Sequence, residues 1–490
     1  MFCLIVCCLL VQGDQISARQ FRRMVRDTLD DPQLADGVWG LVVDAPLRGQ
    51  RLISIHPETN FRPASNMKIL TTYSAFRALG CDYVYTTDFG WCGAIQDEVL
   101  RGWLVVGAYG DPSLGGERNG QLSSHAIFQQ VANALRTQGI KHIERGIQIY
   151  QPVFDKEYVD GTWEVGDLGT YYGSTVTDLS TNDSWSTVVL RMGSAGNVSY
   201  EFEPPTVQTI VRLQVGVGEQ EQLSTSRTPD GTFTINGEMT VCSQARVRMS
   251  VARPDLTFAE SLARYLETIG IRVGGSIQLT DQWPAGTYPL ISIPSLTLSD
   301  LAEVLMKESQ NRYADCFAKT VAFHQRGVGS FDEFADVLQM QLAADGISTA
   351  GLSVRDGSGL SAQNYVRPEI LLGVLNSQLE HVDAARWLTT FPVMGVDGTL
   401  ERRGDDRTVG RVWAKTGYIY RSRTLSGYVE TFDGEPLVFS IMVNNYGAST
   451  TVINHVQDDL VALMVRLKAP RRVRNAPNRY VLSRLAVPSP

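Results

Sequence analysis

Ser65 and Lys68 stand one helical turn apart in the stretch PASNMKILTTYSAF, residues 63–76. Residues three apart on a helix share a face, so the Lys68 ammonium can approach the Ser65 hydroxyl. A serine becomes a good nucleophile when a neighbouring base takes its proton, and burial or a nearby cation can adapt a lysine to that task. The spacing fits an acyl-transfer nucleophile. It also fits an N-cap serine beside a lysine whose aliphatic stem covers apolar surface.

Two further motifs favour the catalytic interpretation. Ser309–Asn311 stand in KESQNRYAD, at the predicted junction of two helices, and Lys415–Gly417 stand in VWAKTGYIY, on a predicted strand. In this order, Ser-x-x-Lys, Ser-x-Asn and Lys-Thr-Gly resemble the signature of the penicillin-recognising serine acyl-transferases. A second Ser-x-Asn occurs at Ser180–Asn182, within a region of short strands. We prefer Ser309, because a helix junction can deliver a hydroxyl and an amide into a cleft.

The second motif and the lysine of the third have defined tasks in such a site. Ser309 can hydrogen-bond both Ser65 and Lys415 and relay a proton to the leaving amine. The Asn311 amide can hold Lys68 or the peptide group of the substrate. Lys415 adds a second cation, which attracts a substrate carboxylate and lowers the pKa of a neighbouring lysine by repulsion. We therefore predict three catalytic and two substrate-binding residues: Ser65, Lys68 and Ser309, then Asn311 and Lys415.

The residues after Lys415 continue the predicted binding strand. Thr416 can bind the same substrate carboxylate. Gly417 allows another backbone to approach the strand closely. The backbone N–H groups of Ser65 and Tyr418 can form an oxyanion hole, and a helix N-terminus favours negative charge there. Thr416 and Gly417 are thus predicted to bind substrate, and Ser65 and Tyr418 to form the oxyanion hole.

The whole pattern resembles the D-Ala-D-Ala carboxypeptidase/endopeptidase penicillin-binding proteins of low-molecular-mass class C, a DacB-like family of serine peptidases. Similar stretches lie across most of residues 20–467: LVVGAYGDPSL, VRDGSGLS (354–361), FPVMGVDGTLERR (391–403) and AKTGYIYRSRTLSGYV. Tyr418 departs from the usual Thr or Ser, and Gln310 from the usual Asp or Asn. The glycines and acidic residues of GDPSL, DGSGLS and VDGTL are interpreted as turn formers without a catalytic role.

The resemblance implies a serine D,D-peptidase of peptidoglycan that forms an acyl-enzyme and needs no cofactor or metal. Its implied partners are stem peptides ending in D-Ala-D-Ala, D-Ala–diaminopimelate cross-links, or both, with β-lactam antibiotics as covalent inhibitors. One alternative is a non-catalytic cell-wall-binding protein with the same fold, for which Tyr418 is an argument. Another is a β-lactamase or esterase, although no Glu-x-x-Leu-Asn that could direct a deacylating water stands between Asn311 and Lys415.

Hydrophobic periodicity predicts the elements that must position these residues. Helices are expected at 16–31, 66–80, 123–138, 257–269 and 449–467, and strands at 37–45 and 50–58, followed much later by three strands after residue 410. We expect an α/β (α+β) fold with a penicillin-binding transpeptidase/β-lactamase-like core: one antiparallel sheet from both chain ends, with helices on both faces. The catalytic domain is predicted at 16–84 and 290–467. Residues 85–289 form a β-rich insert, and the resemblance implies two nested domains in it.

Composition restricts the remaining possibilities. The 490 residues carry a formal net charge of −8, which argues against a nucleic-acid-binding surface. Residues 1–13 are predicted to be a signal peptide, or alternatively a buried strand, so we expect an exported periplasmic or cell-envelope protein without a membrane-spanning segment in the mature chain. The basic tail 468–490 is expected to be solvated or to contact an anionic surface. Cys81 and Cys92 can pair in an oxidising compartment or remain thiols.

Overall fold

The computed structural model describes residues 15–116, 120–203, 210–228, 232–470 and 482. The chain forms two compact units, each built from separate segments. One contains Met1–Cys81, Ala302–Gln310 and Ala335–Pro490; the other contains Asp82–Leu301 and Asn311–Phe334. We call them the first and the second unit. The predicted signal peptide and nearly all of the predicted basic tail lie outside the described residues.

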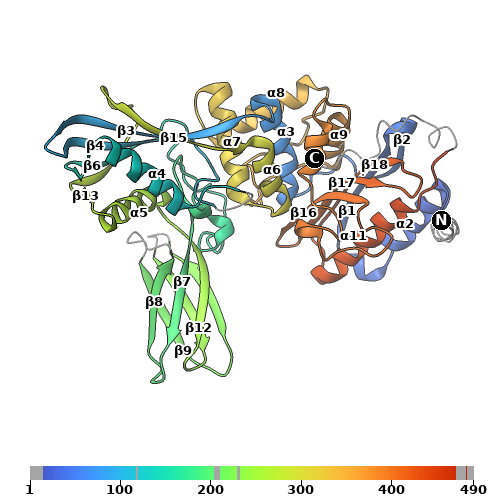
Figure 1. The fold of residues 1–490 in the computed structure, drawn as a ribbon. Coiled ribbons are helices and arrows are strands. Elements are labelled where there is room, and N and C mark those ends of the chain that lie inside the picture. The colour runs from blue at the N-terminus through green and yellow to red at the C-terminus, as the bar shows by residue number, and fades with distance from the viewer. Residues whose placement is uncertain (1–14, 117–119, 204–209, 229–231, 471–481, 483–490) are drawn as a thin grey trace, which may run out of the picture. The chain divides into compact units, whose positions relative to one another are not determined.

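The first unit is built on a five-stranded antiparallel sheet with the order β16-β17-β18-β1-β2 (Figure 1). Its strands come from both chain ends: β1 (Val38–Ala45), β2 (Gln50–Ile55), β16 (Val412–Ile419), β17 (Ser422–Glu430) and β18 (Pro436–Asn444). The turn between β1 and β2 is the 3₁₀ helix η3 (Pro46–Arg48), closed by Gly49 in the left-handed region at φ 58°. The predicted sheet made from both chain ends is confirmed.

Helices cover both faces of this sheet. On one face α2 (Ala18–Leu29) and α11 (Thr450–Val465) pack on side chains such as Leu41, Leu425 and Ile441, which are fully buried. On the other face α9 (Pro368–Leu379) packs on the central strands, and α3 (Met67–Leu79) packs on α9. Residues 67–75 of α3 are all buried, so this helix is central to its unit, as its apolar sequence predicts.

The second unit contains a seven-stranded sheet and two three-stranded sheets. The larger sheet consists of β3 (Val84–Gln96), β4 (Val99–Ala108), β5 (His142–Ile143), β6 (Gly146–Tyr150), β13 (Arg272–Val273), β14 (Ser276–Thr280) and β15 (Tyr288–Thr297), and shares a core with α4 (Ser124–Thr137) and α5 (Pro254–Thr268). The smaller sheets share another core and consist of β7 (Trp185–Met192), β8 (Val198–Glu203) and β12 (Gln244–Ser250), and of β9 (Val211–Val217), β10 (Gln222–Arg227) and β11 (Phe233–Met239).

The remaining helices lie in the sequence between β15 of the second unit and β16 of the first: α6 (Leu298–Lys307), α7 (Asn311–Arg326), α8 (Phe331–Ala344) and α10 (Ala384–Thr389). Short 3₁₀ helices are η2 (Pro32–Leu34), η4 (Ala64–Asn66), η5 (Tyr171–Gly173), η6 (Asn182–Ser184) and η7 (Gly398–Leu400). The mixed α/β class is confirmed, whereas the predicted domain limits stay a prediction. In the described part of the chain, every helix is too short or too polar to cross a membrane.

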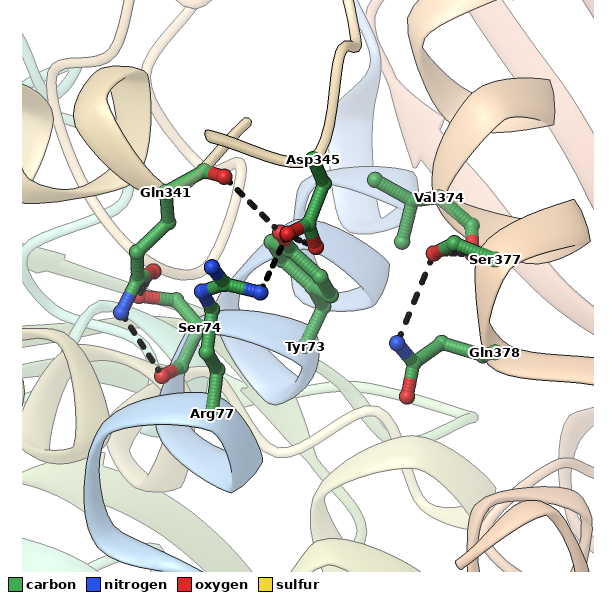
Figure 2. A network of polar contacts seen from close by, with 8 residues as sticks. All are labelled: Tyr73, Ser74, Arg77, Gln341, Asp345, Val374, Ser377 and Gln378. Atoms are coloured by element: carbon green, nitrogen blue, oxygen red, sulfur yellow. Dashed lines mark hydrogen bonds and ion pairs between the residues drawn. The ribbon is translucent and has the colours of Figure 1, made fainter. Parts of the chain in front are cut away.

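A polar network holds α3 against the end of α8 (Figure 2). The Tyr73 hydroxyl donates to Oδ2 of Asp345 over 2.6 Å, and the Arg77 guanidinium forms an ion pair with the same carboxylate. One turn away, the Ser74 hydroxyl donates to Oε1 of Gln341 over 2.5 Å. Because α3 also carries Lys68, these contacts fix the helix on which the predicted nucleophile and base depend.

We expect Tyr73→Phe to lower the free energy of unfolding by about 1.5–3 kcal/mol, because it removes a hydrogen bond to a charged acceptor and leaves a similar volume. Ser377→Ala is the control: the Ser377 hydroxyl bonds Val374 within α9, so its loss does not uncouple two elements. Urea denaturation followed by circular dichroism measures both. Equal stabilities of Tyr73→Phe and the wild type would show that the network does not hold α3.

Candidate active site

Ser65 lies at the turn where η4 leads into α3. Ser65 is partly exposed to solvent, whereas Lys68 is fully buried. The Lys68 ammonium donates to the Ser65 hydroxyl oxygen over 2.8 Å and to the carbonyl oxygen of Ser358 over 2.8 Å. The predicted contact between the serine and the lysine is therefore present, and one side of the serine remains open to solvent.

Hydrogen bonds to the sheet fix the backbone on either side of Ser65. The Asn66 amide donates to the carbonyl of Lys415 over 2.7 Å, and its oxygen accepts from the Ser426 hydroxyl over 2.7 Å. The Thr424 hydroxyl donates to the carbonyl of Pro63 over 2.9 Å. The nucleophile turn is thus attached to β16 and β17 through buried hydrogen bonds, which are strong because water is excluded.

The loop at 354–361 supplies the Ser358 carbonyl that accepts a hydrogen bond from the Lys68 ammonium. Its shape comes from the buried Asp356 carboxylate, which accepts from the N–H groups of Gly359 and Ser361 over 2.7 Å each. Gly359 has φ +82°, and a Cβ there would lie 1.9 Å from the carbonyl oxygen of Ala64. Sequence patterns identify these residues only as turn formers and do not reveal the Ser358 carbonyl as an acceptor for Lys68.

Lys415 points into the interior from the edge strand β16 and has no exposed surface. Its ammonium donates to the carbonyl of Thr416 over 3.0 Å. Burial lowers the pKa of Lys415 well below its usual value, and repulsion by Lys68 and then Arg423 lowers it further. The predicted second lysine beside Lys68 is therefore present, and its lowered pKa means that its charged form is disfavoured by burial.

Ser65 opens into a pocket of about 260 Å³. Seven residues of the first unit line it: Ser65, Ser309, Thr399, Thr416, Gly417, Tyr418 and Arg423. Thr399 and Arg423 were not predicted. The Thr416 hydroxyl donates to that of Thr399 over 2.8 Å, which explains why the VDGTL turn belongs to the pocket wall.

Gly417 lies where β16 passes closest to the nucleophile turn. A Cβ on Gly417 would come within 3.0 Å of the Ser65 nitrogen, 2.9 Å of the Pro63 carbonyl oxygen and 2.2 Å of the Thr424 hydroxyl. Any side chain would therefore separate the strand from the serine, which is the close approach predicted for this glycine. The oxyanion hole of Ser65 and Tyr418 stays a prediction.

The Ser309–Asn311 motif stands between α6 and α7, as expected, but its members fall in different units. Ser309 adopts φ +61° and lines the pocket. Two contacts fix the end of α6 in the same unit: an ion pair of 3.0 Å between Lys307 and Asp397, and the close passage of Gly398 against the Lys307 carbonyl.

Asn311 begins α7 of the second unit and donates to the carbonyl of Tyr172 over 2.9 Å. Its role toward Lys68 or the substrate stays a prediction.

The cysteines and potential metal ligands give two further results. No disulfide joins Cys81 to Cys92, so the thiol alternative holds. Among the residues that the structure describes, no group of three or more His, Cys, Asp or Glu side chains could hold a metal ion.

Comparisons with known proteins identify the family of the chain. Residues 21–467 match the model of the D-Ala-D-Ala carboxypeptidase 3 (S13) family. A D-alanyl-D-alanine carboxypeptidase of Actinomadura sp. (strain R39) is 28% identical, covering 91% of this chain and 84% of the relative. The D-alanyl-D-alanine carboxypeptidase DacB of Haemophilus influenzae is 27% identical, covering 81% and 84%.

Among solved structures, penicillin binding protein 4 (dacB) of Haemophilus influenzae is similar to this chain. The TM-score is 0.79 at 25% sequence identity, over 90% of this chain and 99% of that one. The family match extends over far more than half of the sequence and includes the elements that carry Ser65, Ser309 and Lys415. The chain therefore belongs to the D-Ala-D-Ala carboxypeptidase 3 (S13) family and is a serine-type D-Ala-D-Ala carboxypeptidase with the fold of a penicillin-binding protein.

Proposed function

We propose that Ser65 is the nucleophile that cleaves the terminal D-Ala-D-Ala bond of a peptidoglycan stem peptide. Its Oγ forms a bond to the penultimate D-Ala carbonyl carbon, the C–N bond breaks, and D-Ala leaves with a proton on its amine. Water then hydrolyses the ester and restores Ser65. The observation that carries this proposal is the 2.8 Å contact between the buried Lys68 ammonium and the hydroxyl of the partly exposed Ser65.

The two buried lysines provide the proton acceptor. Placing two ammonium groups near each other without water favours a state in which the pair carries fewer than two protons. In that state Lys68 accepts the Ser65 proton at the distance the structure shows. Ser309, which lines the same pocket, relays a proton to the leaving amine. Lys68 and Ser309 are thus the proposed catalytic partners of Ser65.

The substrate backbone is proposed to lie along the edge strand β16. An edge strand has backbone groups that can pair with an added extended peptide. Gly417 brings this edge against the nucleophile turn, so a peptide paired with β16 presents a carbonyl to Ser65. The N–H groups of Ser65 and Tyr418 then stabilise the oxyanion, while Lys415, Thr416 and Asn311 contribute to substrate binding. The side chain of Tyr418 does not interfere, because only its backbone is needed.

The same chemistry extends to cross-links and to β-lactams. A D-Ala–diaminopimelate cross-link differs only in the amine that leaves, so we propose endopeptidase activity at the same residues. A β-lactam offers an acyl group that keeps its leaving amine attached, which blocks deacylation. The H. influenzae penicillin binding protein 4 has also been solved in complex with a β-lactam. We propose the same covalent reaction at Ser65.

The proposed location follows from this substrate. Peptidoglycan lies outside the cytoplasmic membrane, so we propose an exported protein of the periplasm or cell envelope. We further propose that residues 16–84 and 290–467 form the catalytic domain and that 85–289 hold two nested inserts. Labelling and cleavage by the wild type and by Ser65→Ala distinguish this function from the β-lactamase and non-catalytic alternatives.

We expect Ser65→Ala to abolish both covalent labelling by a fluorescent penicillin and release of D-Ala from a defined muropeptide, at least about 1,000-fold. Mass spectrometry of the products distinguishes carboxypeptidase from endopeptidase action. Ser54→Ala, at an exposed serine of β2, is the control and retains both reactions. Wild-type protein that folds but neither labels nor cleaves supports the non-catalytic alternative, and rapid turnover of penicillin supports a β-lactamase.

Gly417→Ala should reduce acylation by penicillin by about 100-fold, since a shift of about 1 Å at a reacting centre has that effect. The reason is the predicted collision of the new methyl with the Ser65 nitrogen and the Pro63 carbonyl. Gly161→Ala, where a Cβ meets no atom within 4 Å, is the matched control. Unchanged acylation by Gly417→Ala would mean that β16 does not hold the substrate.

Lys415→Met is expected to stabilise the protein at pH 7 by about 1–3 kcal/mol while removing activity, because it replaces a costly buried amine by an apolar chain. In the unfolded chain Lys415 titrates near its ordinary pKa, and in the folded protein its pKa is lower. Between these two values the unfolded state binds more protons, so the stability of the wild type rises with pH. The advantage of Lys415→Met must therefore shrink as the pH approaches 10. Urea denaturation between pH 7 and 10 tests this, and a variant less stable than wild type throughout would refute it.

A further inference from the structure

Arg423 forms part of the wall of the pocket that contains Ser65, although the sequence motifs do not include it. It lies on β17, directly opposite Tyr418 of β16. Residues directly opposite in an antiparallel pair have side chains on the same face, and so do residues two apart on one strand. Thr416, Tyr418 and Arg423 therefore gather on one face at the edge of the sheet, beside the pocket.

The guanidinium of Arg423 is held in a defined position. Its Nε donates to Oδ1 of Asn454 over 2.6 Å, and its central carbon lies 5.1 Å from the centroid of the Tyr418 ring. These contacts use one of its donors and one of its faces. A fixed orientation reduces the entropy lost when a ligand binds.

The charge of Arg423 is not matched by an ion pair within the described residues. The nearby Asp458 carboxylate is engaged by Arg403 over 2.7 Å. Burial lowers the pKa of Arg423, and Arg403 lowers it further, although an arginine remains charged at neutral pH. A partly buried cation that faces a pocket and has no carboxylate of its own can accept one from a ligand.

Lys415 is less suited to direct contact with such a ligand. Its side chain has no exposed surface, and its ammonium already donates to the carbonyl of Thr416. Arg423 instead offers terminal N–H groups whose planar arrangement matches the two oxygens of a carboxylate. The neighbouring Thr416 hydroxyl supplies a further hydrogen-bonding group on the same face.

We propose that Arg423, together with Thr416, binds the free carboxylate of the residue that leaves during the reaction and thereby selects substrates whose leaving residue carries a carboxylate next to the scissile nitrogen. This inference rests on the proposed function, because it places the scissile carbonyl at Ser65. The leaving D-Ala carries its carboxylate one carbon from the scissile nitrogen. The diaminopimelate group that leaves a cross-link carries one at the same position. Tyr418 positions Arg423 through its ring.

The test compares two thioester acyl donors that differ only in the leaving group, thioglycolate or its neutral amide. The activated thioester allows both to react with the serine. We expect Arg423→Gln to reduce kcat/KM for the thioglycolate donor by about 10- to 100-fold, as for other lost hydrogen bonds between charged partners, and to change the amide donor less than about 2-fold. Arg421→Gln is the matched control, since Arg421 is an exposed arginine of the same hairpin that does not line the pocket.

The outcomes distinguish a failure of the role proposed for Arg423 from a failure of the function proposed for Ser65. Equal losses of kcat/KM on both donors mean that Arg423 only supports the fold. Equal kcat/KM values for Arg423→Gln and the wild type mean that Arg423 contacts no carboxylate. Either result overturns the inference while the proposed function stands. Arg423→Lys keeps the charge but not the planar pair of N–H donors, so its kcat/KM should fall several-fold for the thioglycolate donor alone. It replaces Arg423→Gln if that variant fails to fold. A wild type that penicillin does not label at Ser65 overturns the proposed function, and the inference with it.

Discussion

The hydrogen bond from Lys68 to Ser65 imposes the main constraint on this protein, because it requires an ammonium group to be buried beside a hydroxyl that remains open to solvent. Lys68 receives no relief from the second lysine, Lys415, which adds repulsion. Buried cations of this kind are costly, and they are stable only when hydrogen-bond acceptors are placed around them. Here the acceptors are backbone carbonyls, Ser358 for Lys68 and Thr416 for Lys415.

Much of the first unit can be understood as a scaffold for these acceptors. The buried Asp356 shapes the loop that offers the Ser358 carbonyl, and Gly359 lets that loop pass against Ala64. Asn66 and Thr424 attach the nucleophile turn to the sheet, while the network around Asp345 holds the far side of α3 (Figure 2). The sheet joins both chain ends, so segments distant in sequence meet at one serine.

Sequence reasoning reached those features that depend on the periodicity of a single element or on residue type. Helical spacing predicted the contact between Ser65 and Lys68, and strand character placed Lys415–Gly417 on a strand next to the serine. It missed the Ser358 carbonyl, because a backbone acceptor leaves no mark on the residue type. It missed Arg423, because only the pairing of β16 with β17 places that residue opposite Tyr418. An arginine two residues from another in a hairpin carries no sign of which one faces a pocket.

The central claim is that the pair formed by Lys68 and Lys415 loses a proton far more readily than ordinary lysines do. Nitrogen-15 NMR of the lysine side chains, recorded from pH 5 to 11 on the wild type and on Lys415→Met for assignment, measures this directly. The structure predicts that the Nζ signal of Lys415 changes from ammonium to amine at a pH well below the usual lysine value. Two ammonium signals that persist for Lys68 and Lys415 up to pH 10 would contradict the account.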